Sequence, residues 1–292
     1  MHIGLSLNEI IKIICYFILI LFLSFSQNNI KLNIKRVHKP KDIFLHHKVY
    51  IEAHRGANKE FFQNTMEAFK KSIQYEADAI ETDVWLTKDN ELVLLHANSI
   101  YGSLTNYYDH EGNVIDLTWA ELSTYRTIKD NLTMPRLRDL MEIAKNKIFI
   151  DLEIKDQRID LVFPEIIKLI EEFNFFDQIS ICSPFYGYYD KILEYNKHHH
   201  HNLVFGFLYN KDDIYLFDYS KKGSSLNIYW ADATKNVCRE ARRNGMAILA
   251  WIDIDDIENI GIYKQLIENG VDVICCNRPD LAKNYLKDYY NQ

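Results

Sequence analysis

Short apolar runs alternate with longer amphipathic stretches along the chain from residue 49 onward. Compact runs rich in β-branched and aromatic residues predict strands. The expected strands are Val49–His54, Ala79–Leu86, Leu92–His96, Ile148–Ile154, Ile179–Ser183, Val204–Leu208, Leu226–Ala231, Ala247–Ile252 and Val271–Cys276. Helical spacing of apolar residues predicts helices at Asn64–Glu76, Leu137–Lys145, Asp160–Phe173, Gly187–Asn196, Lys235–Asn244, Asp255–Glu268 and Asp280–Tyr290. The alternation predicts an α/β fold with a parallel sheet.

One connection breaks the alternation. Only a few residues, around Lys88, Asp89 and Asn90, separate the second expected strand from the third. A parallel crossover needs about a dozen residues or more, so these two strands must form an antiparallel hairpin. Eight parallel strands remain, which predicts a TIM (β/α)8 barrel with a β-hairpin extension at its rim after the second strand. If the turn centres between Lys88 and Asp89, Glu81 lies opposite His96.

The length of 292 residues accommodates one such barrel behind a short leader. We expect residues 49–292 to form a single TIM-barrel domain, close to the roughly 250 residues usual for this fold. Residues 27–48 are polar and basic and predict a linker, and residues 1–26 predict a signal peptide or a membrane anchor.

The leader contains an almost wholly apolar segment, Ile13–Phe25. This segment is too short to span a bilayer comfortably and is typical of a signal peptide, with the small Ser24 and Ser26 before a cut at Gln27. The alternative is an uncleaved anchor extended back to Ile10, in which case the basic linker favours a cytoplasmic barrel. The expected location is the secretory pathway, as a secreted or membrane-anchored protein.

The net charge of −7 argues against nucleic acid as a partner, because phosphate backbones need clustered Lys and Arg. A small anionic substrate needs only local positive charge or a metal ion. The domain's cysteines (Cys182, Cys238, Cys275 and Cys276) lack CxxC spacing, which argues against a zinc site and predicts buried free thiols. We interpret the run His198–His201 as a solvated helix end or loop.

Polar residues gather where the expected strands end. They are His54 and Arg55 after the first strand, Glu81 and Asp83 on the second, His96 after the hairpin return, Glu153 and Lys155 on the fourth, and Trp251 on the eighth. Active sites of TIM barrels lie at the C-terminal ends of the strands. We therefore expect these side chains to converge on one cup.

The spacing of the carboxylates favours a metal site. Glu81 and Asp83 are two residues apart, so both point to one side of their strand, and Glu153 and Lys155 repeat the pattern. Three carboxylates in one cavity repel each other unless a cation lies between them. Hard oxygen ligands suit Mg²⁺ or Ca²⁺. The alternative is a structural ion cluster in which the carboxylates pair with Arg55 and Lys155.

His54 and His96 flank this expected site. Two imidazoles that titrate near neutral pH can act as base and acid in one catalytic cycle. The alternative is a pair of rim histidines bonded to the backbone.

Several motifs, in order, resemble those of the glycerophosphodiester phosphodiesterase family. The matching segments are His54-Arg55-Gly56, Asn64-Thr65-Met66-Glu67-Ala68-Phe69, Glu81-Thr82-Asp83-Val84, Thr87-Lys88-Asp89, Val93-Leu94-Leu95-His96, Asp116-Leu117-Thr118 with Glu121-Leu122, Glu153-Ile154-Lys155, Ala250-Trp251, Gly270-Val271-Asp272 and Arg278-Pro279-Asp280. They cover about residues 50–285, which is essentially the whole expected domain.

The resemblance implies a metal-dependent phosphodiesterase with one divalent cation, Mg²⁺ or Ca²⁺. The implied roles are metal binding for Glu81, Asp83 and Glu153, acid–base catalysis for His54 and His96, phosphate contact for Arg55 and Lys155, and an apolar wall for Trp251.

Three positions depart from the family pattern. Gln63 stands where the family has Glu, Ala97 removes a carboxylate beside His96, and Asp253 lies in the strand that the family writes as WTVN. Gln63 keeps hydrogen bonding without charge, and the loss at Ala97 leaves the orientation of His96 open.

Three functions remain open on the sequence. The first is hydrolysis of glycerophosphodiesters to glycerol 3-phosphate and an alcohol, in which the nucleophile is water or the substrate's own hydroxyl. The second is lysophospholipase D action on lysophospholipids or N-acyl ethanolamine phospholipids, which a membrane anchor and an aromatic, apolar cup would favour. The third is a non-catalytic barrel that binds phosphodiesters or a protein.

Overall fold

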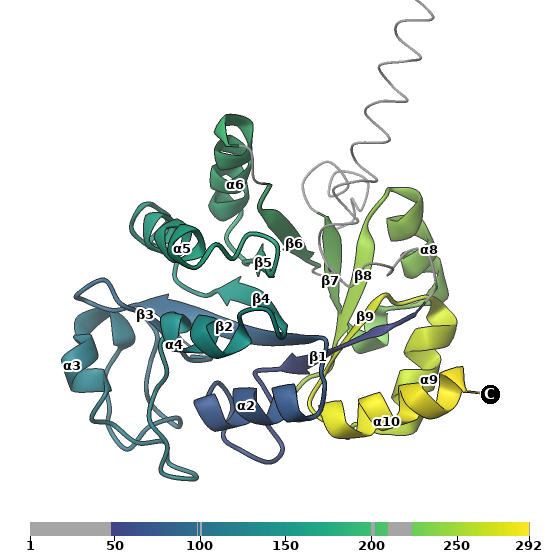
Figure 1. Ribbon diagram of the computed structural model, residues 1–292, viewed down its shortest axis with the longest axis horizontal. Coiled ribbons are helices and arrows are strands. Elements are labelled where there is room, and N and C mark those ends of the chain that lie inside the picture. Colours follow the sequence, from purple (N-terminus) through teal and green to yellow (C-terminus); the bar gives the residue numbers. More distant parts are fainter. Residues whose placement is uncertain (1–47, 98, 100, 200–201, 210–223, 292) are drawn as a thin grey trace, which may run out of the picture.

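The computed structural model describes residues 48–97, 99, 101–199, 202–209 and 224–291 (Figure 1). The expected leader, almost all of the expected linker and half of the histidine run lie outside the described residues, so those interpretations stay predictions. No helix of the described part is both long and apolar enough to cross a bilayer.

Eight parallel strands close into a barrel, as the sequence predicts (Figure 1). They are β1 (Tyr50–His54), β2 (Ala79–Leu86), β4 (Phe149–Ile154), β5 (Ile179–Cys182), β6 (Val204–Leu208), β7 (Ser225–Tyr229), β8 (Ala247–Trp251) and β9 (Val273–Cys276). The order β1-β9-β8-β7-β6-β5-β4-β2 is closed by pairing of β1 with β2. Each strand begins and ends within two residues of its predicted bounds.

Helices cover the outside of the barrel (Figure 1). They are α2 (Met66–Gln74), α3 (Trp119–Leu122), α4 (Leu137–Ala144), α5 (Ile159–Phe173), α6 (Gly187–His198), α8 (Lys235–Arg243), α9 (Ile260–Asn269) and α10 (Pro279–Tyr290), with 3-10 turns η1 (Val114–Asp116) and η2 (Trp230–Asp232). The outward faces of the strands and the inward faces of these helices form one apolar core, in which Ile80, Phe69 and Ile166 are fully buried.

The predicted start of α9 at Asp255 is wrong, because the helix begins at Ile260. The side chain of Asn259 caps it by accepting from the backbone N–H groups of Gly261 and Ile262. The residues before Asn259 form a loop at the mouth of the barrel instead of the first turn of the helix.

The predicted register of the hairpin is wrong by one residue. In β3 (Leu92–Leu94), Leu94 lies opposite Val84, so Glu81 and His96 are not opposite each other. The reason is the position of the turn, which centres on Asp89, whereas the predicted register places the centre between Lys88 and Asp89. Asn90 adopts a left-handed conformation (φ 65°), as expected for a three-residue hairpin loop with a bulge.

Residues between β3 and α4 form a lobe that sequence periodicity did not define. They pack a second apolar cluster around Trp85 that includes Leu104, Tyr107 and Leu122. Thr118 and Glu121 form a capping box at the start of α3. This lobe carries Tyr107 to the rim of the barrel.

Candidate active site

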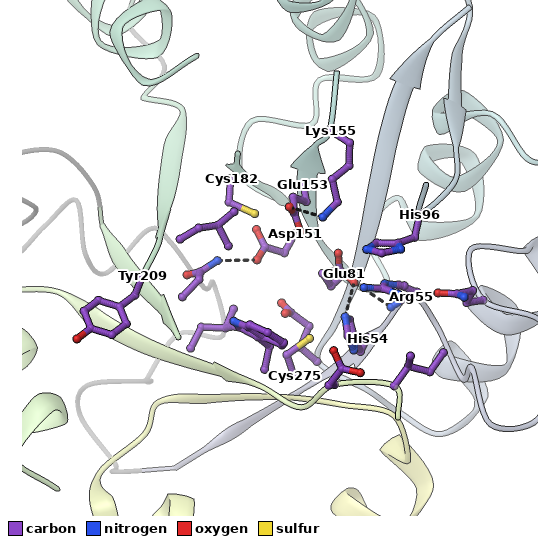
Figure 2. Close-up of a pocket in the computed structure, with 18 of the residues that line it drawn as sticks. His54, Arg55, Glu81, His96, Asp151, Glu153, Lys155, Cys182, Tyr209 and Cys275 are labelled. Carbon is purple, nitrogen blue, oxygen red and sulfur yellow. Dashed lines mark hydrogen bonds and ion pairs between the residues drawn. The ribbon is translucent and has the colours of Figure 1, made fainter. Parts of the chain in front are cut away.

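A cavity of about 470 Å³ opens at the C-terminal ends of the barrel strands (Figure 2). Seven of the eight predicted site residues line it, namely His54, Arg55, Glu81, His96, Glu153, Lys155 and Trp251. The eighth, Asp83, is fully buried just behind the wall. The barrel therefore brings the polar residues of the strand ends together at one cup.

Glu81, Asp83 and Glu153 form the acidic cluster. Each offers one carboxylate oxygen, and these oxygens lie within 4.8 Å of one another. The register explains this, because Asp83 on β2 pairs directly with Glu153 on β4. Burial and the neighbouring Asp83 raise the pKa of Glu81 well above its usual value. A donor set of three hard oxygens in a buried, self-repelling cluster fits Mg²⁺ or Ca²⁺.

Two cations contact the same carboxylates. Arg55 Nε lies 3.3 Å from Asp83 Oδ2, and Lys155 Nζ lies 2.6 Å from Glu153 Oε1 and 3.4 Å from Asp83 Oδ1. Burial alone would raise the pKa of Asp83, but Lys155 and Arg55 hold that pKa well below its usual range. The ion pairs considered as the alternative to a metal site are thus present, yet two positive charges leave one of three carboxylates unbalanced. A divalent cation would make the net charge of the cluster positive, as an anionic substrate requires.

The loop after β1 holds Arg55 in an unusual backbone conformation. Arg55 is left-handed (φ 55°), and its N–H donates to Glu81 Oε2 at 2.9 Å. Its Nη1 donates to Gln63 Oε1 at 2.7 Å. Gly56 (φ 81°) follows, and a Cβ there would lie 2.8 Å from the backbone of Ala68. Such strain persists only where surrounding contacts enforce it, and it is common at functional sites.

Asn64 is a site residue that the spacing argument missed. Its Nδ2 donates to Asp83 Oδ2 at 2.8 Å, and its Oδ1 accepts from Thr82 Oγ1 at 2.7 Å. Asn64 therefore fixes the orientation of one carboxylate of the acidic cluster. The sequence signal for it was the family-like segment that begins at Asn64, just before Thr65, which caps α2.

His54 and His96 approach the acidic cluster from β1 and from the residues after β3. His54 Nε2 lies 3.9 Å from Glu81 Oε2, and burial followed by Arg55 lowers the pKa of His54 well below its usual value. Burial also lowers the pKa of His96 to about 4, against the opposing effect of Asp83. Both imidazoles are therefore neutral near pH 7 and able to accept a proton. His96 pairs with the hydroxyl of Tyr107 rather than with the backbone.

An aromatic wall faces the histidines across the cavity. Trp251 ends β8, and its ring lies 5.0 Å from that of Tyr229. Figure 2 shows Tyr209 on the far side of the cavity from His54 and His96. This side of the cavity is suited to an apolar or aromatic part of a ligand.

Two further carboxylates, on Glu52 and Asp151, line the deep end of the cavity. Each precedes a predicted site residue by two positions, on the same strand face. Spacing alone could have found them. Burial raises the pKa of Asp151 to about 6.

The sequence matches known proteins over almost the whole barrel. A model of the glycerophosphoryl diester phosphodiesterase family matches residues 54–281. A glycerophosphodiester phosphodiesterase of Caldanaerobacter subterraneus subsp. tengcongensis is 28% identical over 253 residues, which cover 82% of this chain and 98% of that one.

Solved structures share the fold. A putative glycerophosphodiester phosphodiesterase from Galdieria sulphuraria has a TM-score of 0.73 at 22% identity, covering 82% of this chain and 98% of that chain. A phosphodiesterase from Oleispira antarctica, in complex with the product sn-glycerol-3-phosphate, has a TM-score of 0.70 at 16% identity, covering 82% of this chain and 96% of that chain.

Proposed function

The chain belongs to the glycerophosphoryl diester phosphodiesterase family, and we propose that it hydrolyses glycerophosphodiesters to glycerol 3-phosphate and an alcohol with one divalent cation. Phosphodiesterase activity follows from the family, and the products, the acid–base pair and the metal site are the finer parts of the proposal. The observation that carries these parts is the cluster of one carboxylate oxygen each from Glu81, Asp83 and Glu153, all within 4.8 Å of one another. The buried His54 and the half-buried His96 lie beside it, each with a lowered pKa.

The three carboxylates would hold the cation, Mg²⁺ or Ca²⁺. When bound, the cation neutralises non-bridging phosphate oxygens, which stabilises the charge that develops in the transition state. Arg55 and Lys155 add positive charge to the same oxygens. Their ion pairs with Asp83 and Glu153 hold both cations in place before the substrate arrives.

His54 and His96 divide the proton transfers. One accepts the proton of the attacking hydroxyl as the new phosphorus–oxygen bond forms. The other must carry a proton in the substrate complex, and it donates that proton to the alcohol oxygen as the old phosphorus–oxygen bond breaks. The nucleophile is water or the glycerol hydroxyl of the substrate, and in the second case water opens the cyclic intermediate with the two roles reversed.

The test is release of glycerol 3-phosphate from glycerophosphocholine by the purified full-length chain, with added Mg²⁺ or Ca²⁺ and with EDTA. We expect metal-dependent turnover that His54→Ala abolishes. Folded, metal-loaded protein without turnover would contradict the proposal.

Lysophospholipase D action is the second candidate, because the wall of Trp251 and Tyr209 offers apolar surface for a lipid. Rates on glycerophosphocholine and on a long-chain lysophospholipid separate the two.

A further inference from the structure

The loop that follows β8 carries negative charge at the mouth of the cavity. Asp253, which is half-buried, and Asp255, which is exposed, both line the cavity. Neither carboxylate has a Lys, Arg or His partner among the described residues. Lys59 contacts the main chain of this loop instead, because its Nζ donates to the backbone oxygen of Ile254 at 2.6 Å. The loop therefore presents two negative charges to a ligand.

The barrel sets these charges opposite the basic side of the site. In the closed strand order, three strands separate β8 from β4 in either direction (β7, β6 and β5, or β9, β1 and β2), so the ends of β8 and β4 face each other across the cavity. Lys155 follows β4, and its ammonium group pairs with Glu153 and Asp83. Burial lowers the pKa of His96, and the charge of Asp253, like that of Asp83, opposes this lowering. Asp253 is therefore within electrostatic reach of the catalytic side.

Hydrogen bonds hold the loop against the aromatic wall. The carboxylate of Asp256 accepts from the hydroxyl of Tyr229 at 3.0 Å and from Nε1 of Trp230 at 2.8 Å. The same carboxylate accepts from the backbone N–H of Asp253 at 3.1 Å. Oδ1 of Asp253 in turn accepts from the backbone N–H of Asp255 at 2.9 Å. The carboxylate of Asp253 is thus held beside the wall before a ligand arrives, which lowers the cost of binding.

The wall beside this loop is aromatic. Trp251 ends β8 two residues before Asp253 and lines the cavity, as does Tyr209, which Figure 2 shows on the far side from His96. Aromatic faces attract cations, and that of tryptophan does so most strongly. A carboxylate beside such a face suits an ammonium group, whereas a neutral alcohol gains little from either. Asp253 also lies in a segment where the chain departs from the family pattern.

We propose that Trp251, Asp253 and Asp255 form a subsite for a positively charged leaving group, so that the enzyme prefers glycerophosphodiesters whose alcohol carries an ammonium group. This inference rests on the proposed function. In such a substrate the ammonium nitrogen lies about 5 Å from phosphorus at ordinary bond lengths. The zwitterion matches the charges of the cavity, with its phosphate at the acidic cluster and its bound cation, and its ammonium group toward the loop after β8. Coulomb attraction extends over several ångströms, so the carboxylates favour the cation without direct contact.

The first readout is the ratio of kcat/KM for a cationic substrate to that for a neutral one, measured with the metal-loaded full-length chain. Glycerophosphocholine should exceed glycerophosphoglycerol about tenfold or more. Glycerophosphoethanolamine should exceed it about threefold or more, because its smaller ammonium group carries the same charge. Both ratios should fall as NaCl rises from about 0.1 M to about 1 M, because the Debye length shortens from about 10 Å to about 3 Å. A ratio near one for either cationic substrate at the lower salt concentration would overturn the inference.

Substitutions then assign the preference to the loop. Asp253→Asn removes the charge and keeps the oxygen that accepts from Asp255, and it should lower the glycerophosphocholine ratio about fivefold. Asp255→Asn should lower it about twofold, because that carboxylate is exposed and screened, and Trp251→Leu about threefold. Any change in the pKa of His96 cancels in the ratio, since both substrates use the same histidines. Glu142→Gln, on the exposed face of α4, also removes one negative charge and is the matched control, which should keep the wild-type ratio. An unchanged ratio in the Asp253→Asn, Asp255→Asn double variant would overturn the inference.

A binding arm separates this inference from the proposed function. If the wild type turns over none of the three substrates, the proposed function fails. Calorimetry of the same metal-loaded protein with glycerophosphocholine and with glycerophosphoglycerol then decides the subsite by itself. Tighter binding of glycerophosphocholine that the double variant loses supports the subsite. Equal binding of the two ligands, or binding of neither, overturns it.

Discussion

The hydroxyl of Tyr107 lies 3.3 Å from Nδ1 of His96, and the two rings are 6.4 Å apart. Tyr107 comes from the lobe between β3 and α4, and its side chain lines the cavity. Ala97 offers no carboxylate beside the histidine. The phenol is thus the hydrogen-bond partner of Nδ1, and in the proposed mechanism it would fix the imidazole with Nε2 toward the substrate.

Tyr107→Phe should lower kcat about tenfold or more with a smaller change in KM, because the ring stays while the hydrogen bond to His96 is lost. Steady-state kinetics on glycerophosphocholine measures this. Tyr108→Phe is the matched control, since Tyr108 is a buried neighbour in the same lobe that does not line the cavity. In a His96→Ala background Tyr107→Phe should add almost nothing, and a full additional loss there would contradict the positioning role.

Divalent cations should stabilise the fold through the acidic cluster. At about 100 times its dissociation constant, a bound ion adds about 2.7 kcal/mol to the free energy of unfolding. Thermal unfolding of the full-length chain with Mg²⁺ or Ca²⁺ should show this as a rise in Tm, which Glu81→Gln removes and Glu142→Gln keeps. A rise of the same size in Glu81→Gln would place the ion elsewhere.

Glu52 should make stability depend on pH. Burial, and then Asp151, raises the pKa of Glu52 well above 4.5 in the folded state. A carboxyl with a raised folded pKa contributes stability that is full below the unfolded value near 4.5 and is lost as pH rises through the folded value. Glu52→Gln should therefore be more stable than the wild type at neutral pH, by about 1–3 kcal/mol, and the difference should vanish below about pH 4.

Urea unfolding of both proteins across this pH range measures the difference. A difference in the free energy of unfolding that is the same at every pH would show that ionisation of Glu52 does not destabilise the fold. A Glu52→Gln protein that is less stable than the wild type at neutral pH would indicate a structural role for Glu52 instead.

Repeating strand geometry accounts for the parts of the molecule that the sequence predicts. Apolar runs fix the strands, and one side chain in two points inward, so spacing assigns Glu81, Asp83 and Glu153 to one cluster at the same end of the barrel. The same rule reaches Glu52 and Asp151, but these two lie a step deeper than the strand ends where an active site is expected. Spacing is sufficient here because the barrel itself is regular.

Loops set the parts that the sequence did not predict. The hairpin register depends on Asn90, whose left-handed backbone moves the turn centre by half a residue and the pairing by one. Tyr107 and Gln63 reach the site from irregular segments, where no period relates sequence position to direction. The resemblance marked the position of Gln63, but its contact with Arg55, like that of Tyr107 with His96, follows only from the structure.

Gln63 should matter through Arg55. Its Oε1 accepts from Arg55 Nη1 at 2.7 Å, and this contact holds the guanidinium beside Asp83. A glutamate at this position would add a negative charge to the cavity, and Gln63 does not. Gln63→Ala should raise KM about tenfold, because Arg55 loses a contact that offsets its left-handed backbone. Gln63→Glu keeps the acceptor and should retain activity within about threefold, since the added charge lies against Arg55. The measurement is KM for glycerophosphocholine in the wild type, Gln63→Ala and Gln63→Glu. If Gln63→Glu is as impaired as Gln63→Ala, the uncharged side chain at this position matters rather than its hydrogen bond to Arg55.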